Sequence, residues 1–322
     1  MEQILQSAAV VVPIIFVLAF GFGAQKAHLF GTDVNPIPII NNLVLKIALP
    51  PMLFVGTIMV TRAQLLEEII LFGALLVALL IAYFVGFLVA KILFRRNSVE
   101  SSIAGLAVSF SAGPFYGPAL LGSLYGVESG VAISIISLVI NVVIVPLATI
   151  IIKLSLAKMA DQHDSLAKLI GHSLFEAIFK TPFVWAPLLA FTLVFLDIKM
   201  PEVVDHSLTL IGKATAGVAV FVAGMTIAAN RFKLSFEVLL IALLKNVGLP
   251  ALFIAIALLF GIQKGALIYD EGLLLAALPS GPMIVLLATK YQQYQQQASS
   301  ILAVSTVGML ITVTALIAFL HG

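Results

Sequence analysis

The stretch Ser109–Tyr125, SFSAGPFYGPALLGSLY, lies inside an apolar run that is long enough to cross a bilayer, yet it carries Gly113, Pro114, Gly117 and Pro118 near its middle. Proline has no amide proton and its ring clashes with the preceding turn, so two prolines four residues apart predict that a helix opens here. Non-helical backbone at membrane depth is tolerated only where protein buries it or where it lines a water-filled cavity. The stretch therefore predicts a functional break in a membrane helix.

A second stretch of the same kind is Ala276–Tyr291, AALPSGPMIVLLATKY, which carries Pro279, Gly281 and Pro282. Its Gly281-Pro282 pair follows Gly113-Pro114 by 168 residues. Two interrupted apolar segments in corresponding halves of one chain are the best sequence pointer to the binding site of a secondary transporter.

The composition supports a polytopic membrane protein. Of the 322 residues, 61% are hydrophobic and only 10% are charged, more apolar surface than a soluble domain can cover. A net charge of +2 gives no indication of a nucleic-acid partner, and the absence of cysteine excludes disulfides, thiol nucleophiles and thiolate metal sites. The N-terminus has no basic leading segment and no small-residue cleavage site, so we expect a retained first helix and not a signal peptide.

A helix needs about 20 apolar residues to span the hydrocarbon core. With that measure the sequence predicts ten transmembrane helices, near residues 7–25, 38–60, 69–92, 101–125, 130–152, 182–198, 207–228, 236–260, 272–290 and 299–320.

The basic residues of the short loops predict the orientation, because cytoplasmic loops carry an excess of Lys and Arg. With the N-terminus outside, ten of them fall in inside loops and three, Arg62, Lys199 and Lys264, in outside loops. The inside set is Lys26, Lys91, Arg95, Arg96, Lys153, Lys158, Lys168, Arg231, Lys233 and Lys290. We therefore expect a multi-pass protein of the cell membrane (plasma or inner membrane) whose two termini both lie on the outside.

Ten helices divide into two sets of five. We expect residues 1–153 to form the first five-helix repeat, 154–180 a cytoplasmic linker with amphipathic helical spacing, and 181–322 a second repeat. Because five is odd, the second repeat must run inverted relative to the first, an architecture that recurs among secondary transporters. We expect the lipid bilayer as a partner of the spans, and both a monomer and a homodimer are compatible with the sequence.

Several motifs resemble the auxin efflux carrier superfamily, over nearly the whole chain. They are FVLAFGFGAQK, NNLVLKIALPPMLF, the first broken stretch, LTLIGKATAGVAVFVAGMTIA and ALPSGPMIVLLATKY. The resemblance implies the fold of the bile-acid sodium symporters, in which helices 4 and 9 are broken and cross. It also implies small organic anions such as malate or malonate as substrates. Many members carry an Asn in each broken segment where this chain has Ala112 and Met283, which weakens a sodium site taken from relatives.

The breaks themselves are candidate anion sites. The second half of a broken helix begins at mid-membrane with free amides and the positive end of its dipole, which favours a carboxylate. The substrate-binding residues predicted there are Ser111, Gly113, Pro114, Tyr116, Gly117, Pro118, Pro279, Ser280, Gly281 and Pro282. The alternative for each break is a plain helix kink.

Three polar residues elsewhere in the spans complete the predicted substrate site. Lys245 lies near the middle of the eighth span, where a charge is costly, so we expect it to face the interior and attract or bind an anionic substrate. The alternatives are a lysine that extends to the surface or one held by carbonyls freed at Pro250. Lys46 is nearer to its span's cytoplasmic end and can instead extend to the surface. Asn141, in the fifth span, either contacts substrate or stabilises a helix contact.

The sequence favours a uniporter of di- or hydroxycarboxylates with alternating access at the helix 4/helix 9 crossing. Asp270 and Glu271 are the carboxylates nearest to a span interior, and we expect them at the mouth of the ninth helix. Proton-coupled carriers often rely on membrane carboxylates, so this favours uniport, with sodium- or proton-coupled symport as the alternative. No hydrolase or metalloprotease motif is present, and we expect no enzyme activity, cofactor or metal.

Overall fold

The computed structural model describes residues 2–31, 35–59, 61–126, 129–159, 171, 175, 179, 181–229 and 233–320, and apart from one isolated β-bridge the regular structure of these residues is helical. The first half contains α1 (Glu2–Lys26), α2 (Pro36–Leu43), η1 (Val44–Ala48), α3 (Leu49–Ile58), α4 (Arg62–Leu88), η2 (Val89–Leu93), α5 (Ser98–Ser109), α6 (Gly113–Tyr125), α7 (Gly130–Leu138), η4 (Val139–Ile144) and α8 (Val145–Met159). The second half contains α10 (Pro182–Phe195), α11 (Glu202–Gly212), α12 (Ala214–Ala229), α13 (Phe236–Leu243), η5 (Leu244–Gly248), α14 (Leu249–Leu259), α15 (Leu267–Ala277), α16 (Met283–Lys290) and α17 (Gln295–Leu320). The predicted linker helix at 154–180 lies largely outside the described residues.

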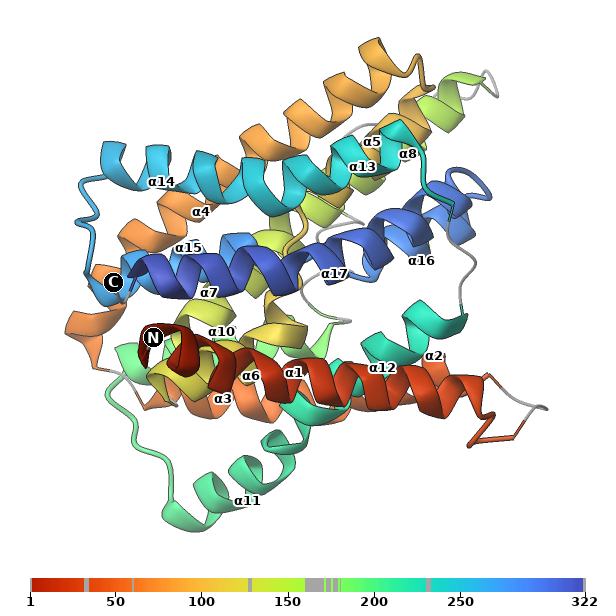
Figure 1. Ribbon diagram of the computed structural model, residues 1–322. Coiled ribbons are helices and arrows are strands. Elements are labelled where there is room, and N and C mark those ends of the chain that lie inside the picture. Colours follow the sequence, from red (N-terminus) through yellow and green to blue (C-terminus); the bar gives the residue numbers. More distant parts are fainter. Residues whose placement is uncertain are drawn as a thin grey trace.

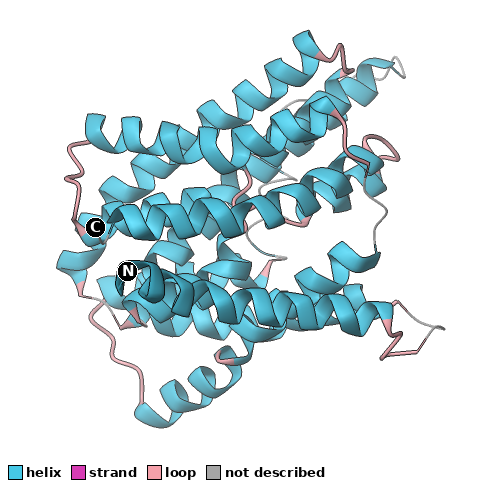
Figure 2. Ribbon diagram, viewed as in Figure 1, coloured by secondary structure: helices cyan, strands magenta, loops and turns pink. Residues whose placement is uncertain are grey.

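The helices pack in two groups that run side by side (Figures 1 and 2). In one group α1 packs on α12, and α3 packs on α10 and α11. In the other α4 packs on α5 and α14, and α13 packs on α17. The helices α5, α15 and α16 belong to the second group, whereas α6 packs on α12 and α1 of the first group, so the first broken pair passes from one group to the other.

Close backbone approach holds α1 against α12. A methyl group on Gly21 would lie 1.9 Å from the carbonyl oxygen of Phe221, and one on Gly224 would lie 2.0 Å from that of Leu18. Small residues let membrane helices approach closely enough for extensive van der Waals contact. Since both contacts join the same two helices, α1 and α12 form one stiff wall.

Among the described residues, three of the four π turns are followed by a proline, with one residue between the turn and the proline. The turns η1, η4 and η5 precede Pro50, Pro146 and Pro250. A proline inside a helix lacks the amide and clashes with the carbonyl four residues earlier, and a π turn relieves both. The turns contain Lys46, Asn141 and Lys245, so prolines determine the local geometry of all three polar candidates.

Six helical stretches among the described residues are long and apolar enough to cross a membrane: Pro36–Ile58, Glu68–Leu93, Gly130–Lys158, Glu202–Ala229, Phe236–Leu259 and Gln295–Leu320. Val12–Lys26 and Pro182–Phe195 are shorter apolar helices. The two broken pairs coincide with the predicted fourth and ninth spans. The chain is thus an all-helical polytopic membrane protein, and the count of ten spans stays a prediction.

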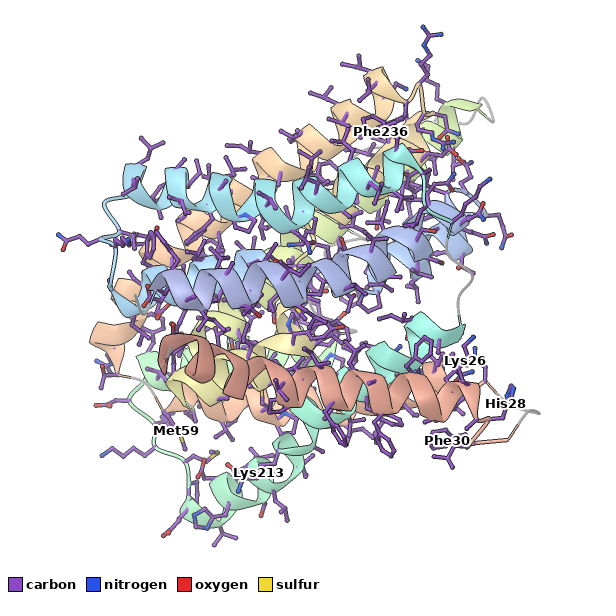
Figure 3. The ribbon with its side chains drawn as sticks, in the orientation of Figure 1. Lys26, His28, Phe30, Met59, Lys213 and Phe236 are labelled. Atoms are coloured by element: carbon purple, nitrogen blue, oxygen red, sulfur yellow. The ribbon has the colours of Figure 1, made fainter. Side chains whose placement is uncertain are left out.

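Large apolar side chains cover the outside of the bundle, as expected of a lipid-facing surface. Ile92 is 71% exposed, Ile311 74% and Leu259 81%. Lys26 and Phe236 lie toward one end of the helices and Met59 toward the other (Figure 3), which agrees with the predicted alternation of the loops.

Candidate functional site: the crossing of two broken helices

The first break is present, and it lies just before the prolines. α5 ends at Ser109, Phe110 is extended (ψ 106°), and α6 begins at Gly113 with Pro114 in its first turn. Proline is favoured in that position because its missing amide has no intrahelical partner there. The expectation that Pro118 also opens the helix is wrong, because α6 continues through it to Tyr125.

The second break spans five residues, Leu278 to Pro282. α15 ends at Ala277, Leu278 is extended (ψ 152°), and Pro282 is the N-cap of α16. Gly281 lies against the first break: a methyl group on it would lie 1.9 Å from the ring of Phe110. Only glycine allows this approach, so Gly281 fixes the distance between the two breaks.

The two breaks cross as short extended segments joined in antiparallel direction. Ser111 and Ser280 form an isolated β-bridge, and the amide of Ala112 donates to the carbonyl of Pro279 at 2.9 Å. Each serine side chain also donates to a carbonyl of the opposite helix: Ser111 Oγ to Leu275, and Ser280 Oγ to Ala107. Ser111 and Ser280 therefore satisfy carbonyls near the C-terminal ends of α15 and α5, and they hold the crossing together.

The helix α17 also holds the second break, through hydrogen bonds at Ser305. The amide of Ser280 donates to Ser305 Oγ of α17 at 3.2 Å, and Asn246 Nδ2 donates to the carbonyl of Ser305 at 2.7 Å. Both contacts are buried. The extended segment is thus fixed on two sides, by the first break and by α17.

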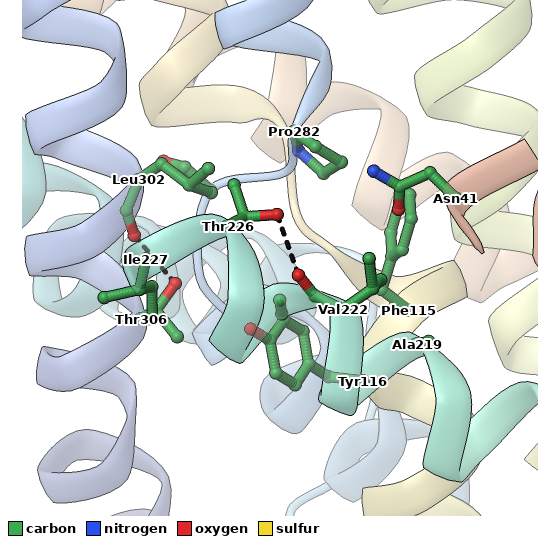
Figure 4. Close-up of a pocket in the computed structure, with 12 residues that line it drawn as sticks. Asn41, Phe115, Tyr116, Ala219, Val222, Thr226, Ile227, Pro282, Leu302 and Thr306 are labelled. Atoms are coloured by element: carbon green, nitrogen blue, oxygen red, sulfur yellow. Dashed lines mark hydrogen bonds between the residues drawn. The ribbon is translucent and has the colours of Figure 1, made fainter. Parts of the chain in front are cut away.

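A cavity lies at the crossing, on the side that faces α12 (Figure 4). It has about 360 Å³ of empty space, including the part that lies open at its mouth. We call it the crossing cavity; it is lined by Asn41, Phe115, Tyr116, Ala219, Val222, Ala223, Thr226, Ile227, Ser280, Pro282, Leu302 and Thr306. Residues of both breaks, of α2, of α12 and of α17 thus meet in one place.

Only three of the residues predicted to bind substrate line this cavity: Tyr116, Ser280 and Pro282. Sequence reasoning missed Asn41, Phe115, Thr226 and Thr306. Asn41 stands in the NNLVLK motif, and Phe115 adjoins the first Gly-Pro pair, so local signals existed for these two. Thr226 and Thr306 resemble any helix-packing threonine in the sequence, and both donate within their own helices, to Val222 and Leu302.

The electrostatics of the cavity come from helix ends. Phe115 and Tyr116 belong to the first turn of α6, and Pro282 caps α16. The amides of Phe115 and Tyr116 donate to the carbonyl of Ala112, and the amide of Val285 donates to the carbonyl of Pro282, so what each helix N-terminus offers the cavity is the positive partial charge of its dipole. None of the described residues that line the cavity is charged. The arrangement suits an anionic group held by two helix N-termini.

Lys245 is fully buried, and its ammonium donates to the carbonyl of Ala276 at 2.8 Å. That carbonyl belongs to the last turn of α15, the negative end of the helix dipole, where a cation is stabilised. The expectation that Lys245 faces the interior is confirmed. It lies behind the second break and does not line the crossing cavity.

The remaining candidates lie away from the cavity. Asn141 is buried in η4 and donates to the carbonyl of Ser137 at 2.8 Å, within its own helix. Lys46 is exposed in η1. Gly117 packs against Ile133, and Gly113 against Ile136. Pro114 and Pro279 shape the helix ends but do not line the cavity.

One carboxylate is buried within the protein. Glu271 is 1% exposed and is the fifth residue of α15, near the start of the helix. Both Asp270 and Glu271 lie close enough to Tyr125, the last residue of α6, to act on it electrostatically. A buried carboxylate at this end of the broken helices bears on the question of proton coupling.

A polar cluster that sequence reasoning also missed joins three segments at the far end of the crossing. Arg96 binds both carboxylate oxygens of Glu237, at 2.6 and 3.1 Å, and Tyr294 donates to the same carboxylate at 2.8 Å. The bond to Glu237 raises the pKa of Arg96, and burial beside that carboxylate raises the pKa of Tyr294. The cluster fixes the start of α5, the start of α13 and the loop before α17 together.

The all-helical fold, the lipid-facing surface and the two broken helices that meet at a cavity define a polytopic membrane protein with the architecture of a transporter. Comparison with known proteins agrees. The Membrane transport protein family matches residues 7–317, and the chain belongs to this family, that of the auxin efflux carriers. It is 29% identical to the uncharacterized transporter YfdV of Escherichia coli K12, over 302 residues and 93% of each chain. The same values hold for YfdV of Escherichia coli O157:H7 and of Shigella flexneri.

Proposed function

We propose that the protein is a secondary carrier of small organic anions that binds a carboxylate group in the crossing cavity. The observation that carries the proposal is the position of this cavity, beside the N-terminal ends of both α6 and α16 and without a charged side chain in its lining. Two helix N-termini attract an anion but leave it only weakly held, which suits a carrier that must release its cargo.

Transport then proceeds by alternating access. Ten transmembrane helices in two inverted five-helix repeats give the crossing two related entrances, one on each side of the membrane. The α1/α12 wall borders the cavity on one side and the broken helices border it on the other, so relative movement of the two groups can expose it to either face. Malate and malonate are the favoured substrates because of the family resemblance.

The coupling mode is uniport in this proposal. The Lys245 amine donates to a carbonyl at the C-terminal end of α15, a place where a transported cation would otherwise find that carbonyl. Ala112 and Met283 supply no side-chain oxygen at either break. Proton-coupled symport is the second candidate, and the buried Glu271 is the observation that favours it.

Uptake of radiolabelled malonate and malate into proteoliposomes tests the proposal. We expect saturable uptake that does not need sodium and that an inside-positive membrane potential accelerates, as movement of net negative charge requires. Uptake that needs a pH gradient and follows protonation of Glu271, lost in Glu271→Gln, would support proton coupling instead. Folded protein that moves none of a panel of mono- and dicarboxylates would contradict the proposal.

A further inference from the structure

A second, smaller cavity adjoins the first. Its exposed lining is apolar, and it has about 230 Å³ of empty space, including the part that lies open at its mouth; it is lined by Ile14, Tyr116, Leu120, Leu278, Met309, Leu310 and Val313. We call it the apolar cavity. Tyr116 is the residue that lines both cavities.

The two cavities follow one another along the same helices. On α17 the crossing cavity is lined by Leu302 and Thr306, and the apolar cavity by residues from Met309 to Val313. At a rise of 1.5 Å per residue, Thr306 and Val313 are about 10 Å apart along the helix axis. The second cavity therefore lies beyond the first in the direction of the C-terminal end of α17.

A backbone segment and a side chain separate the two cavities, and they differ in the number of hydrogen bonds that hold them in place. One is the extended segment of the second break, which places Leu278 on one side and Ser280 on the other. It is fixed by bonds from Ala112 to Pro279, from Ser280 to Ala107 and from Ser280 to Ser305. The other is the ring of Tyr116, which is 3% exposed and whose hydroxyl contacts the Thr306 side chain.

We infer that the Tyr116 side chain is the gate between the crossing cavity and the apolar cavity, and so closes the substrate path on that side. A rotamer change of one side chain breaks a single polar contact, whereas displacement of the break segment breaks three or more hydrogen bonds. The inference rests on the proposed function in taking the crossing cavity as part of a transport path. Its test needs no transported substrate, so the two can fail separately.

The experiment is a cysteine accessibility measurement, which the cysteine-free chain permits without further substitutions. Val313→Cys reports on the apolar cavity and Thr226→Cys on the crossing cavity. Each is combined with Tyr116, Tyr116→Phe or Tyr116→Ala, and reacted in inside-out and right-side-out vesicles with the impermeant anion 2-sulfonatoethyl methanethiosulfonate. The face from which Thr226→Cys reacts defines the entrance of the crossing cavity.

From that face we expect Val313→Cys to react at least tenfold faster with Tyr116→Ala than with Tyr116, while Tyr116→Phe, which keeps the ring, stays within twofold. The Thr226→Cys rate should be the same in all three backgrounds. An acceleration below tenfold at position 313, or an equal acceleration at position 226, overturns the inference. Should the alanine variant not elute as a folded protein, Tyr116→Leu takes its place with the same criteria.

Discussion

Replacement of Lys245 by methionine removes a fully buried ammonium group and keeps an unbranched side chain of similar length. We expect two results that differ in size. The free energy of unfolding should change by no more than about 2 kcal/mol, while the KM for a transported carboxylate should rise about fivefold.

The small effect on stability follows from opposing terms. A lysine at the centre of a membrane helix costs roughly 2.5–3.5 kcal/mol on insertion scales, and methionine removes that cost. The substitution also removes the bond from Lys245 to Ala276, a hydrogen bond of a charged group worth about 1.5–3 kcal/mol, and a helix C-terminal interaction worth about 0.3–1 kcal/mol. These terms offset one another to within about 2 kcal/mol.

The effect on KM follows from distance. Ala276, which the ammonium contacts, is four residues from Ser280 in the wall of the crossing cavity. Consecutive Cα atoms are about 3.8 Å apart, so the Cα atoms of Ala276 and Ser280 are separated by at most roughly 15 Å, and we take about 15 Å as the distance between the two charges. Two unit charges at about 15 Å and an effective dielectric constant of about 20 interact by ~1 kcal/mol, which corresponds to about fivefold in affinity.

Both quantities are measured on the same preparations, uptake kinetics in proteoliposomes and unfolding in detergent followed by the fluorescence of Trp185, the single tryptophan. Lys245→Arg is the matched control, because it keeps the charge and should leave KM within about twofold. An unchanged KM in Lys245→Met would refute the reasoning and leave the helix ends as the source of anion preference.

Three further predictions concern the break, the polar cluster and the orientation. Pro282→Ala restores an amide at the cap of α16 and allows the helix to extend into the break, so uptake should fall at least about fivefold while unfolding changes by less than about 1 kcal/mol; unimpaired uptake at equal protein level would mean that Pro282 only bends the helix. Glu237→Gln weakens the two charged bonds to Arg96 and should lower stability by about 2 kcal/mol, measured by thermal unfolding; an unchanged midpoint would show that the cluster contributes nothing. Lys158→Cys should react with an impermeant maleimide only in inside-out vesicles and Lys199→Cys only in intact cells; the reverse pattern would overturn the orientation predicted from loop charges.

The sequence predicted the breaks because proline and glycine act locally. Pro114 and Pro282 occupy the first turn and the cap of the two second-half helices, where their missing amides fit. The prediction for Pro118 was wrong because a membrane helix can continue through a proline when neighbouring groups satisfy the freed backbone carbonyl. No local sequence signal distinguishes a proline that opens a helix from one that the helix accommodates. The π turns before Pro50, Pro146 and Pro250 could not be predicted either, because a search for regular α-helical spacing does not detect a locally wider turn.

The partners of the polar groups could not be predicted, because they come from distant parts of the chain. Ser111 bonds to Leu275, Ser280 to Ala107, and Lys245 to Ala276. A sequence shows that such a group is buried and in need of a partner, but not whether a ligand or a carbonyl satisfies it. Asn141 illustrates the point, since its donor is satisfied within its own helix.

The most direct test of the central claim asks whether a transported carboxylate occupies the crossing cavity. Thr226→Cys, in its lining, and Ser123→Cys, exposed near the far end of α6, are each labelled with 2-sulfonatoethyl methanethiosulfonate at increasing concentrations of the carboxylate. We predict that labelling at position 226 slows, with half-protection near the KM for uptake, while labelling at position 123 does not change. Unchanged labelling at position 226 under a saturating concentration of a carboxylate that the protein transports would contradict the account.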